Sequence, residues 1–73
     1  MDNKQYRLII FNLREAIEES GMKQKVVAER CEMPARKLND ILCFRKRLDA
    51  DTIPAFCKVL NVQPERFFRG LVS

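Results

Sequence analysis

Histidine and tryptophan are absent from this 73-residue chain, and it has only two glycines. Without histidine, the chain lacks the commonest general base and a usual ligand of mixed zinc sites. It also has no glycine-rich phosphate loop and no paired acidic cluster suited to catalysis. We therefore expect neither an enzyme nor a protein with a metal or cofactor, and no small-molecule ligand is evident.

The three cysteines are too few and too widely spaced to form a zinc site. Cys31, Cys43 and Cys57 are an odd set separated by 12 and 14 positions, whereas zinc ligands come in close pairs. Each also lies among apolar neighbours at helical spacing. We interpret all three as reduced packing residues without chemical function.

Long apolar runs are missing as well. The longest, Leu8 to Phe11, has four residues, far below the ~20 that cross a bilayer. The first residues, Met1 to Lys4, lack the charged-then-apolar layout of a secretory signal. The sequence thus predicts a compact protein of one domain over residues 1–73, without a membrane partner and located in the cytoplasm.

The net charge of +4 is concentrated in the middle of the chain. Residues 21–47 hold eight basic and three acidic residues, a local net charge of +5. The net charge is −1 over residues 1–20 and zero over residues 48–73. Local basic charge is what a phosphate-binding surface requires, because neutralised phosphates release condensed counterions. A solvated charged face would have the same composition, so charge alone does not decide between the two.

Helical periodicity runs through the whole chain. Gly21 ends the first helix, because glycine enters the left-handed conformation at little cost. Pro34, Pro54 and Pro64 fit the first turns of later helices, where a missing N–H is tolerated. Helices are expected over residues 6–20, 23–31, 34–43, 51–60 and from about 64 onward, making an all-α fold of five helices.

Two details of the C-terminal part follow from the same pattern. Asp51 is the expected N-cap of the fourth helix, since its carboxylate can accept from free backbone N–H groups. The last helix is expected to close the core with three apolar side chains: Phe67, Phe68 and Leu71.

Residues 22–42 have the layout of a helix-turn-helix, two short helices joined by a tight turn. The run Gly21 to Pro34, followed by Leu38 to Leu42, resembles the phage Cro/repressor class (XRE-type) of regulators. In that class, a glutamine opens the first helix and an alanine four residues later permits close helix packing, as Gln24 and Ala28 would here. The resemblance spans about residues 8–68 and implies a five-helix, lambda-repressor-like domain that binds double-stranded DNA.

The chain departs from this class at the turns. Glu32 stands where the class usually has glycine, at an expected cost of about 1 kcal/mol if its backbone is left-handed. Pro34 replaces the usual serine or threonine cap of the second helix. After that helix, Leu42 and Phe44 replace a glutamate and a glycine, which leaves Phe44 either covering the core edge or taking part in a dimer contact.

The resemblance also implies which residues face DNA. Arg36 has the donors for a bidentate pair with guanine, and Asn39 has the groups for adenine. Asp40 can accept from cytosine, although orienting Arg36 is its preferred role. The expected base-reading residues are Ala35, Arg36, Asn39 and Asp40. The expected phosphate-binding residues, which set register without reading sequence, are Lys23, Gln24, Lys37, Arg45, Lys46 and Arg47.

A repressor of phage, prophage or mobile-element type is the function that this pattern predicts, acting as a homodimer because one module contacts little DNA. The alternative is a protein-interaction module of the same fold, such as an antitoxin or anti-repressor subunit. A partner-binding face would be rich in exposed apolar residues, whereas the expected face of the helix from Pro34 to Leu42 is polar and charged. That difference favours DNA.

Overall fold

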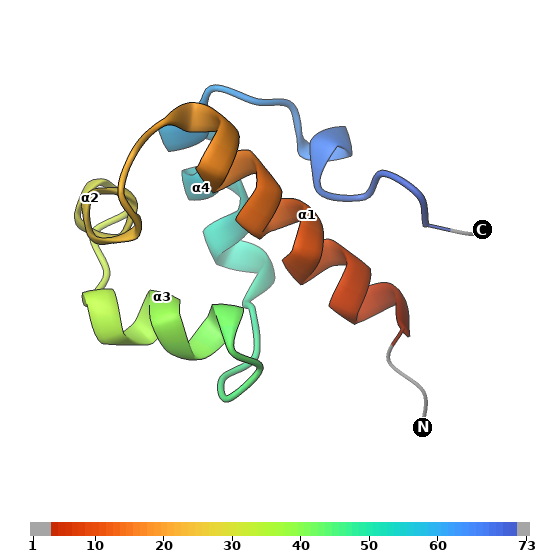
Figure 1. The fold of residues 1–73 in the computed structure, drawn as a ribbon, viewed down its shortest axis with the longest axis horizontal. Coiled ribbons are helices and arrows are strands. Elements are labelled where there is room, and N and C mark those ends of the chain that lie inside the picture. The colour runs from red at the N-terminus through yellow and green to blue at the C-terminus, as the bar shows by residue number, and fades with distance from the viewer. Residues whose placement is uncertain (1–3, 72–73) are drawn as a thin grey trace.

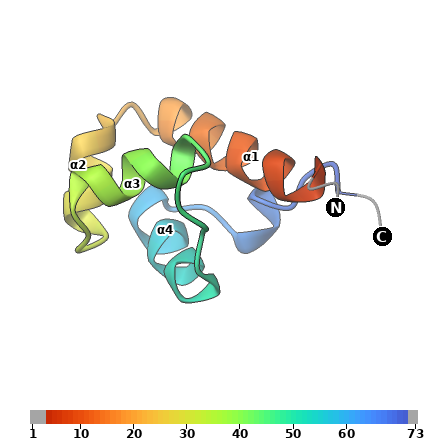
Figure 2. The same cartoon turned by 90° about the horizontal axis from the view of Figure 1, so that it is seen from below.

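The structure is a computed structural model in which residues 4–71 are described. These residues form helices and turns and contain no strand, in agreement with the all-α prediction. Figure 1 shows α1 crossing the molecule, and Figure 2 shows α3 next to α2, in agreement with the packing of these two helices. The elements are α1 (Lys4–Ser20), α2 (Gln24–Arg30), α3 (Ala35–Leu42), the 3-10 turn η1 (Ala50–Thr52), α4 (Ile53–Leu60) and the 3-10 turn η2 (Pro64–Arg66).

The helices share one apolar core. Helix α1 contributes a buried stripe at three- and four-residue spacing, as its amphipathic pattern predicts. Gly21 follows it with a φ of +77°, which confirms glycine as the end of this helix. The buried apolar side chains are Ile10, Leu13, Ala16, Ile17, Val27, Ala28, Leu38, Ile41, Leu42, Phe56, Leu60 and Phe67.

Helices α2 and α3 pack directly against each other. Ala28 of α2 and Leu38 of α3 are both completely buried. A methyl side chain at Ala28 lets the two backbones approach, and Leu38 fills the remaining space. The tight α2–α3 pair therefore fixes the direction in which the opposite edge of α3 points.

Both helices of this pair end in a left-handed residue. After α2, Met33 N–H donates to Ala28 C=O at 3.0 Å and Glu32 has a φ of +58°. After α3, Arg45 N–H donates to Asp40 C=O at 2.8 Å and Phe44 has a φ of +66°. These are Schellman turns, in which glycine is the usual left-handed residue. The strain expected at Glu32 is thus present, and Phe44 adds a second strained position.

Replacing Glu32 by glycine should stabilise the fold. Glu32→Gly removes a left-handed strain of about 1–2 kcal/mol, part of which is offset because glycine also loosens the unfolded chain. We expect the free energy of unfolding to rise by about 0.5–1 kcal/mol in urea denaturation followed by circular dichroism. Asn61→Gly is the matched control, and its free energy of unfolding should rise by less, because asparagine tolerates the φ of +56° at this position. A less stable Glu32→Gly protein would show that the side chain contributes more than the strain costs.

The C-terminal segment corrects the five-helix prediction. Instead of a fifth helix, the chain forms the single turn η2 and then further turns up to Gly70. Phe67 is buried as expected, but Phe68 is 40% exposed and does not close the core. Phe67 and Phe68 are neighbours in the chain, and neighbouring residues of a helical turn point in different directions. When Phe67 enters the core, Phe68 therefore points away from it.

The start of α4 also differs from expectation. Asp51 lies inside η1 and does not cap the helix; the residue before α4 is Thr52. The Thr52 hydroxyl donates to Asp49 C=O at 2.6 Å. Pro54 occupies the first turn of α4, as predicted.

Two polar side chains tie the C-terminal segment to α1. Asn12 is buried, and its amide donates to the carbonyl oxygens of Phe67 and Arg69, both at 2.9 Å. The Arg66 guanidinium contacts Glu15 at 3.2 Å and Glu19 at 2.9 Å. These hydrogen bonds and ion pairs hold the C-terminal segment against α1, although the segment does not form a regular α-helix.

Candidate nucleic-acid interface

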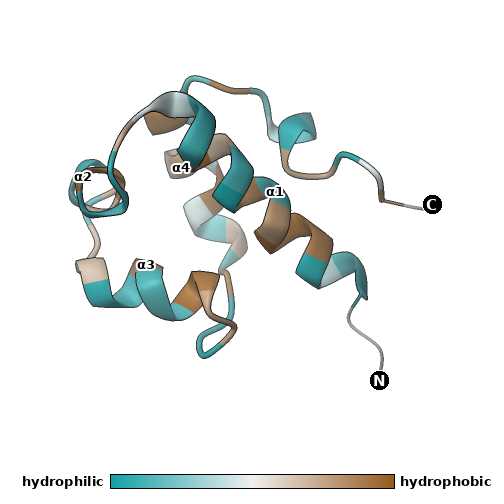
Figure 3. Ribbon diagram, viewed as in Figure 1, coloured by the Kyte–Doolittle hydropathy of each residue, from teal (hydrophilic) through white to brown (hydrophobic). Residues whose placement is uncertain are grey.

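One edge of α3 is polar and open to solvent. Ala35, Arg36 and Asn39 are exposed, whereas Lys37 and Asp40 are partly covered. The opposite edge carries Leu38, Ile41 and Leu42, which are all buried. The separation follows from helical spacing. Figure 3 shows that hydrophilic and hydrophobic residues both occur along α3.

Asn39 is connected to the start of α2. The Gln24 amide donates to Asn39 Oδ1 at 3.4 Å, and the Cys43 thiol lies 3.9 Å from the same oxygen. This long hydrogen bond joins two residues that were assigned different roles, one toward phosphate and one toward bases. Because the Asn39 amide nitrogen is not used in these contacts, it remains available to donate to a base edge.

Asp40 has a different partner from the one expected. Its carboxylate lies 3.7 Å from the Arg45 guanidinium, and in the described part of the chain Arg36 takes no ion pair. The Schellman turn after α3 folds Arg45 back toward Asp40, which explains the exchange of partners. The Arg36 side chain is consequently free of an internal carboxylate and can meet an external acceptor.

The loop after α3 keeps its basic residues on the surface. Arg45, Lys46 and Arg47 are all exposed. The Arg47 guanidinium stacks over the Tyr6 ring, 4.4 Å from its centroid, and the Tyr6 hydroxyl accepts from Leu48 N–H at 2.8 Å. Tyr6 thereby anchors this basic loop beside α3.

The remaining expected phosphate-binding residues lie at the beginnings of the two helices. Lys23 and Gln24 are exposed at the start of α2, and Lys37 is in the first turn of α3. Together with the loop after α3, they flank the polar edge of that helix in the chain. Two contacts join this set to the expected base-reading residues in space: Gln24 with Asn39 and Arg45 with Asp40.

Sequence reasoning missed the anchoring role of Tyr6. Tyr6 lies at the start of the helix expected over residues 6–20, where helical spacing indicates only an apolar packing residue. In the structure it is half-buried and its hydroxyl accepts a hydrogen bond. The signal was the hydroxyl itself, because a tyrosine at the edge of a core usually finds a hydrogen-bond partner.

Other kinds of site find no support in residues 4–71. Burial raises the pKa of the Cys31 thiol, and burial followed by the charge of Glu65 raises that of Cys57, so both thiols stay protonated at neutral pH. Cys43 is exposed beside Asn39. Residues 4–71 contain no group of three or more potential metal ligands. No helix in this range is long and apolar enough to span a membrane.

Comparison with known proteins agrees with the all-α fold and its helix-turn-helix. No curated protein and no solved structure matches the chain. A family model described as the Cro/C1-type HTH DNA-binding domain matches residues 12–68. This range includes α2, the turn, α3 and α4 as well as about half of α1. Because the match covers well over half of the sequence, the chain belongs to the Cro/C1-type helix-turn-helix DNA-binding domain family.

Proposed function

We propose that this chain is a sequence-specific transcriptional repressor of phage or mobile-element type, acting in the cytoplasm. In this proposal α3 enters the major groove, where Arg36 and Asn39 contact base edges. The major groove admits one α-helix and presents a distinct donor and acceptor pattern for each base pair. Ala35 approaches the bases with its methyl group, and Asp40 acts mainly through its ion pair with Arg45.

The observation that carries the proposal is the exposed polar edge of α3. Arg36 and Asn39 are three residues apart, so both side chains leave the helix on the same side. Leu38, on the opposite side of α3, is buried in the same core as Ala28 of α2, which leaves this edge facing outward. Arg45, Lys46 and Arg47 supply positive charge next to it, as binding to two phosphate backbones requires.

The alternative, an antitoxin or anti-repressor module, is less well supported. It calls for exposed apolar side chains on α3, and the exposed residues there are Ala35, Arg36 and Asn39. The large exposed apolar residues are elsewhere, namely Phe11, Phe44 and Phe68. Apolar contact with a protein therefore belongs to a different surface from the proposed DNA-reading one.

The proposed regulator binds as a homodimer. A single module of this size buries a small interface on DNA, and two-fold dimers on half-sites about one helical turn apart enlarge it. The expected operator is consequently an inverted repeat.

Selection of bound sequences from random duplex DNA tests the proposal. The expected result at about 0.15 M salt is one enriched motif with two inverted half-sites. Recovery of DNA without an enriched motif would show non-specific binding only. Failure to retain any DNA would favour the protein-interaction alternative.

Lys46 is expected to contribute to affinity without contributing to sequence preference. Lys46→Ala should weaken binding to the selected site and to a shuffled duplex by the same factor, and should lower the salt dependence of log K by about one unit. Fluorescence anisotropy titrations at several salt concentrations measure both quantities. A change confined to the selected site would instead assign Lys46 to base reading.

A further inference from the structure

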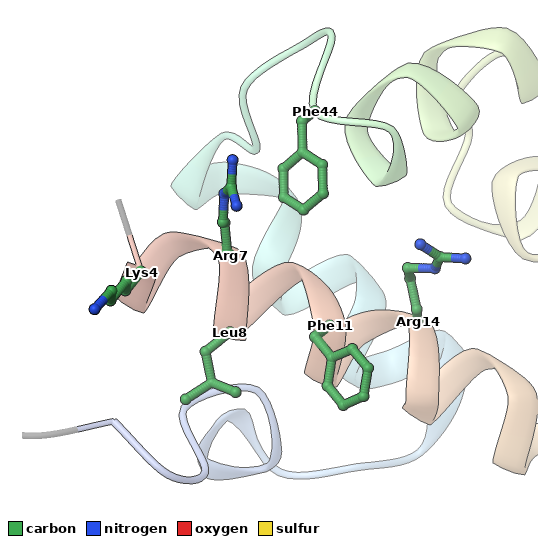
Figure 4. A pocket seen from close by; sticks show the side chains of 6 residues that line it. All are labelled: Lys4, Arg7, Leu8, Phe11, Arg14 and Phe44. Atoms are coloured by element: carbon green, nitrogen blue, oxygen red, sulfur yellow. The ribbon is translucent and has the colours of Figure 1, made fainter. Parts of the chain in front are cut away.

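An apolar patch interrupts the polar surface of α1. Phe11 is 58% exposed and Phe44, from the loop after α3, is 50% exposed. Together with Leu8 they line a shallow hollow of about 480 Å³, whose rim is basic and includes Arg7 and Arg14. Figure 4 shows Leu8 and Phe11 on neighbouring turns of α1 and Phe44 directed toward Arg7. Large exposed aromatic residues grouped in this way are typical of a protein contact.

Phe44 is held in place on this surface. The Phe44 ring packs edge-on against the Tyr6 ring, with 6.5 Å between the two centroids. The Arg7 guanidinium lies 5.8 Å from the centroid of the Phe44 ring. It therefore forms a fixed wall of the hollow, even though its backbone is left-handed. Phe44 is half-exposed and reaches the core through Tyr6, so of its two expected roles the dimer contact is the one that this position favours.

The charges on the same face of α1 are divided about Phe11. Lys4 and Arg7 precede it, and Arg14, Glu15 and Glu18 follow it, all at helical spacing on the side that carries Phe11. Glu15 is also paired with Arg66 of the same copy, at 3.2 Å. A second hollow, of about 290 Å³, lies on the acidic side of Phe11 and is lined by Arg14, Glu15 and Glu18. The face is thus apolar at its centre and basic before Phe11, and it has a net negative charge after Phe11, where two carboxylates outnumber Arg14.

We propose that this face binds a second copy of the chain, with the two α1 helices antiparallel and a two-fold axis at Phe11. In that arrangement each residue faces the one equally far on the other side of Phe11. Arg7 then faces Glu15 of the other copy, and Lys4 faces Glu18. The interface is isologous, so every charge pair occurs twice.

The charge pattern selects this occupant and this direction. Parallel α1 helices would place like charges opposite each other, whereas antiparallel helices place opposite charges together. Each Phe11 ring fills the hollow bounded by Leu8 and Phe44 of the other copy, and the apolar stem of Arg14 covers its side. Because one helix face is a small interface, the dimer is expected to be weak and reversible.

The inference specifies the contact surface of the homodimer in the proposed function, but it is tested without DNA. Sedimentation equilibrium between about 10 μM and 1 mM should show a monomer–dimer equilibrium. Phe11→Asp should weaken dimerisation at least tenfold, because it puts two carboxylates at the centre of the interface. Phe68→Asp is the matched control, since Phe68 is an exposed phenylalanine outside the hollow, and it should leave the equilibrium unchanged.

A charge exchange tests the antiparallel direction. Lys4→Glu and Glu18→Lys should each dimerise more weakly than the original chain, whereas an equimolar mixture of the two should dimerise as strongly as the original, because every pair is again of opposite sign. Failure of the mixture to recover would overturn the antiparallel arrangement. A chain that stays monomeric up to about 1 mM would overturn the proposed contact between copies. It would also remove the support for the homodimer in the proposed function, whereas base contact by Arg36 and Asn39 is tested separately by the DNA selection.

Discussion

Arg36→Ala is expected to weaken binding to the selected DNA site by about 5- to 150-fold, the effect of losing one bidentate contact worth about 1–3 kcal/mol. Arg36 is exposed on α3 and, within the described residues, is not held by a carboxylate. Its guanidinium therefore needs no internal bond to be broken before it meets a guanine. Binding to a shuffled duplex should weaken much less, so the ratio of the two affinities should fall.

Repeating the selection with the Arg36→Ala protein should relax the motif at one base pair in each half-site. Arg69→Ala is the matched control, because it removes an exposed arginine from the C-terminal segment, away from α3. It should leave the motif and the affinity ratio unchanged. Equal losses on selected and shuffled DNA for Arg36→Ala would show that this residue contacts phosphate instead of a base.

Leu38→Ala is expected to destabilise the fold by about 2–5 kcal/mol. Leu38 is completely buried opposite the polar edge of α3, in the same core as Val27 and Ala28. Truncating it leaves a cavity between α2 and α3. The melting temperature should fall by about 8 °C or more in a domain of this size, as followed by circular dichroism.

The same measurement on Arg36→Ala provides the comparison within one helix. Because Arg36 is exposed, its removal should change stability by less than about 0.5 kcal/mol. The two substitutions should therefore separate: Leu38→Ala loses stability, and Arg36→Ala loses DNA preference on an intact fold. A Leu38→Ala protein as stable as the Arg36→Ala protein would contradict the packing described for the α2–α3 pair.

The first four helices were predictable because their signals are local. Gly21, Pro34 and Pro54 mark helix ends by backbone geometry alone, and the apolar spacing of α1 and α3 identifies their buried sides. The left-handed backbone at Glu32 was also anticipated, since the family has glycine there. In each case, one or two residues decide the local conformation whatever surrounds them.

The C-terminal segment was predicted less well because tertiary contacts determine its shape. Pro64 fits the first turn of a helix and apolar residues follow it, which predicted a fifth helix. In the structure, the carbonyl oxygens of Phe67 and Arg69 instead accept from Asn12, more than fifty positions earlier in the chain. A hydrogen bond over such a distance leaves no local pattern. The buried asparagine within the apolar stripe of α1 was its only trace in the sequence.

The site shows the same division between local and distant signals. Helical spacing was enough to put Arg36 and Asn39 on one edge of α3. The partner of Asp40 was expected at the i−4 position, and the turn after the helix supplied Arg45 instead. Likewise, the anchoring of Arg47 on Tyr6 joins two segments that only the folded chain brings together.

Replacement of each guanine of the selected operator by 7-deazaguanine tests the central claim most directly. The replacement removes the N7 acceptor from the major groove and leaves the base pair and the minor groove intact. If α3 lies in the major groove, replacing one particular guanine in each half-site should weaken binding of the original chain to the operator. The same replacement should not weaken binding of the Arg36→Ala protein. Unchanged affinity at every guanine of the operator would contradict the account.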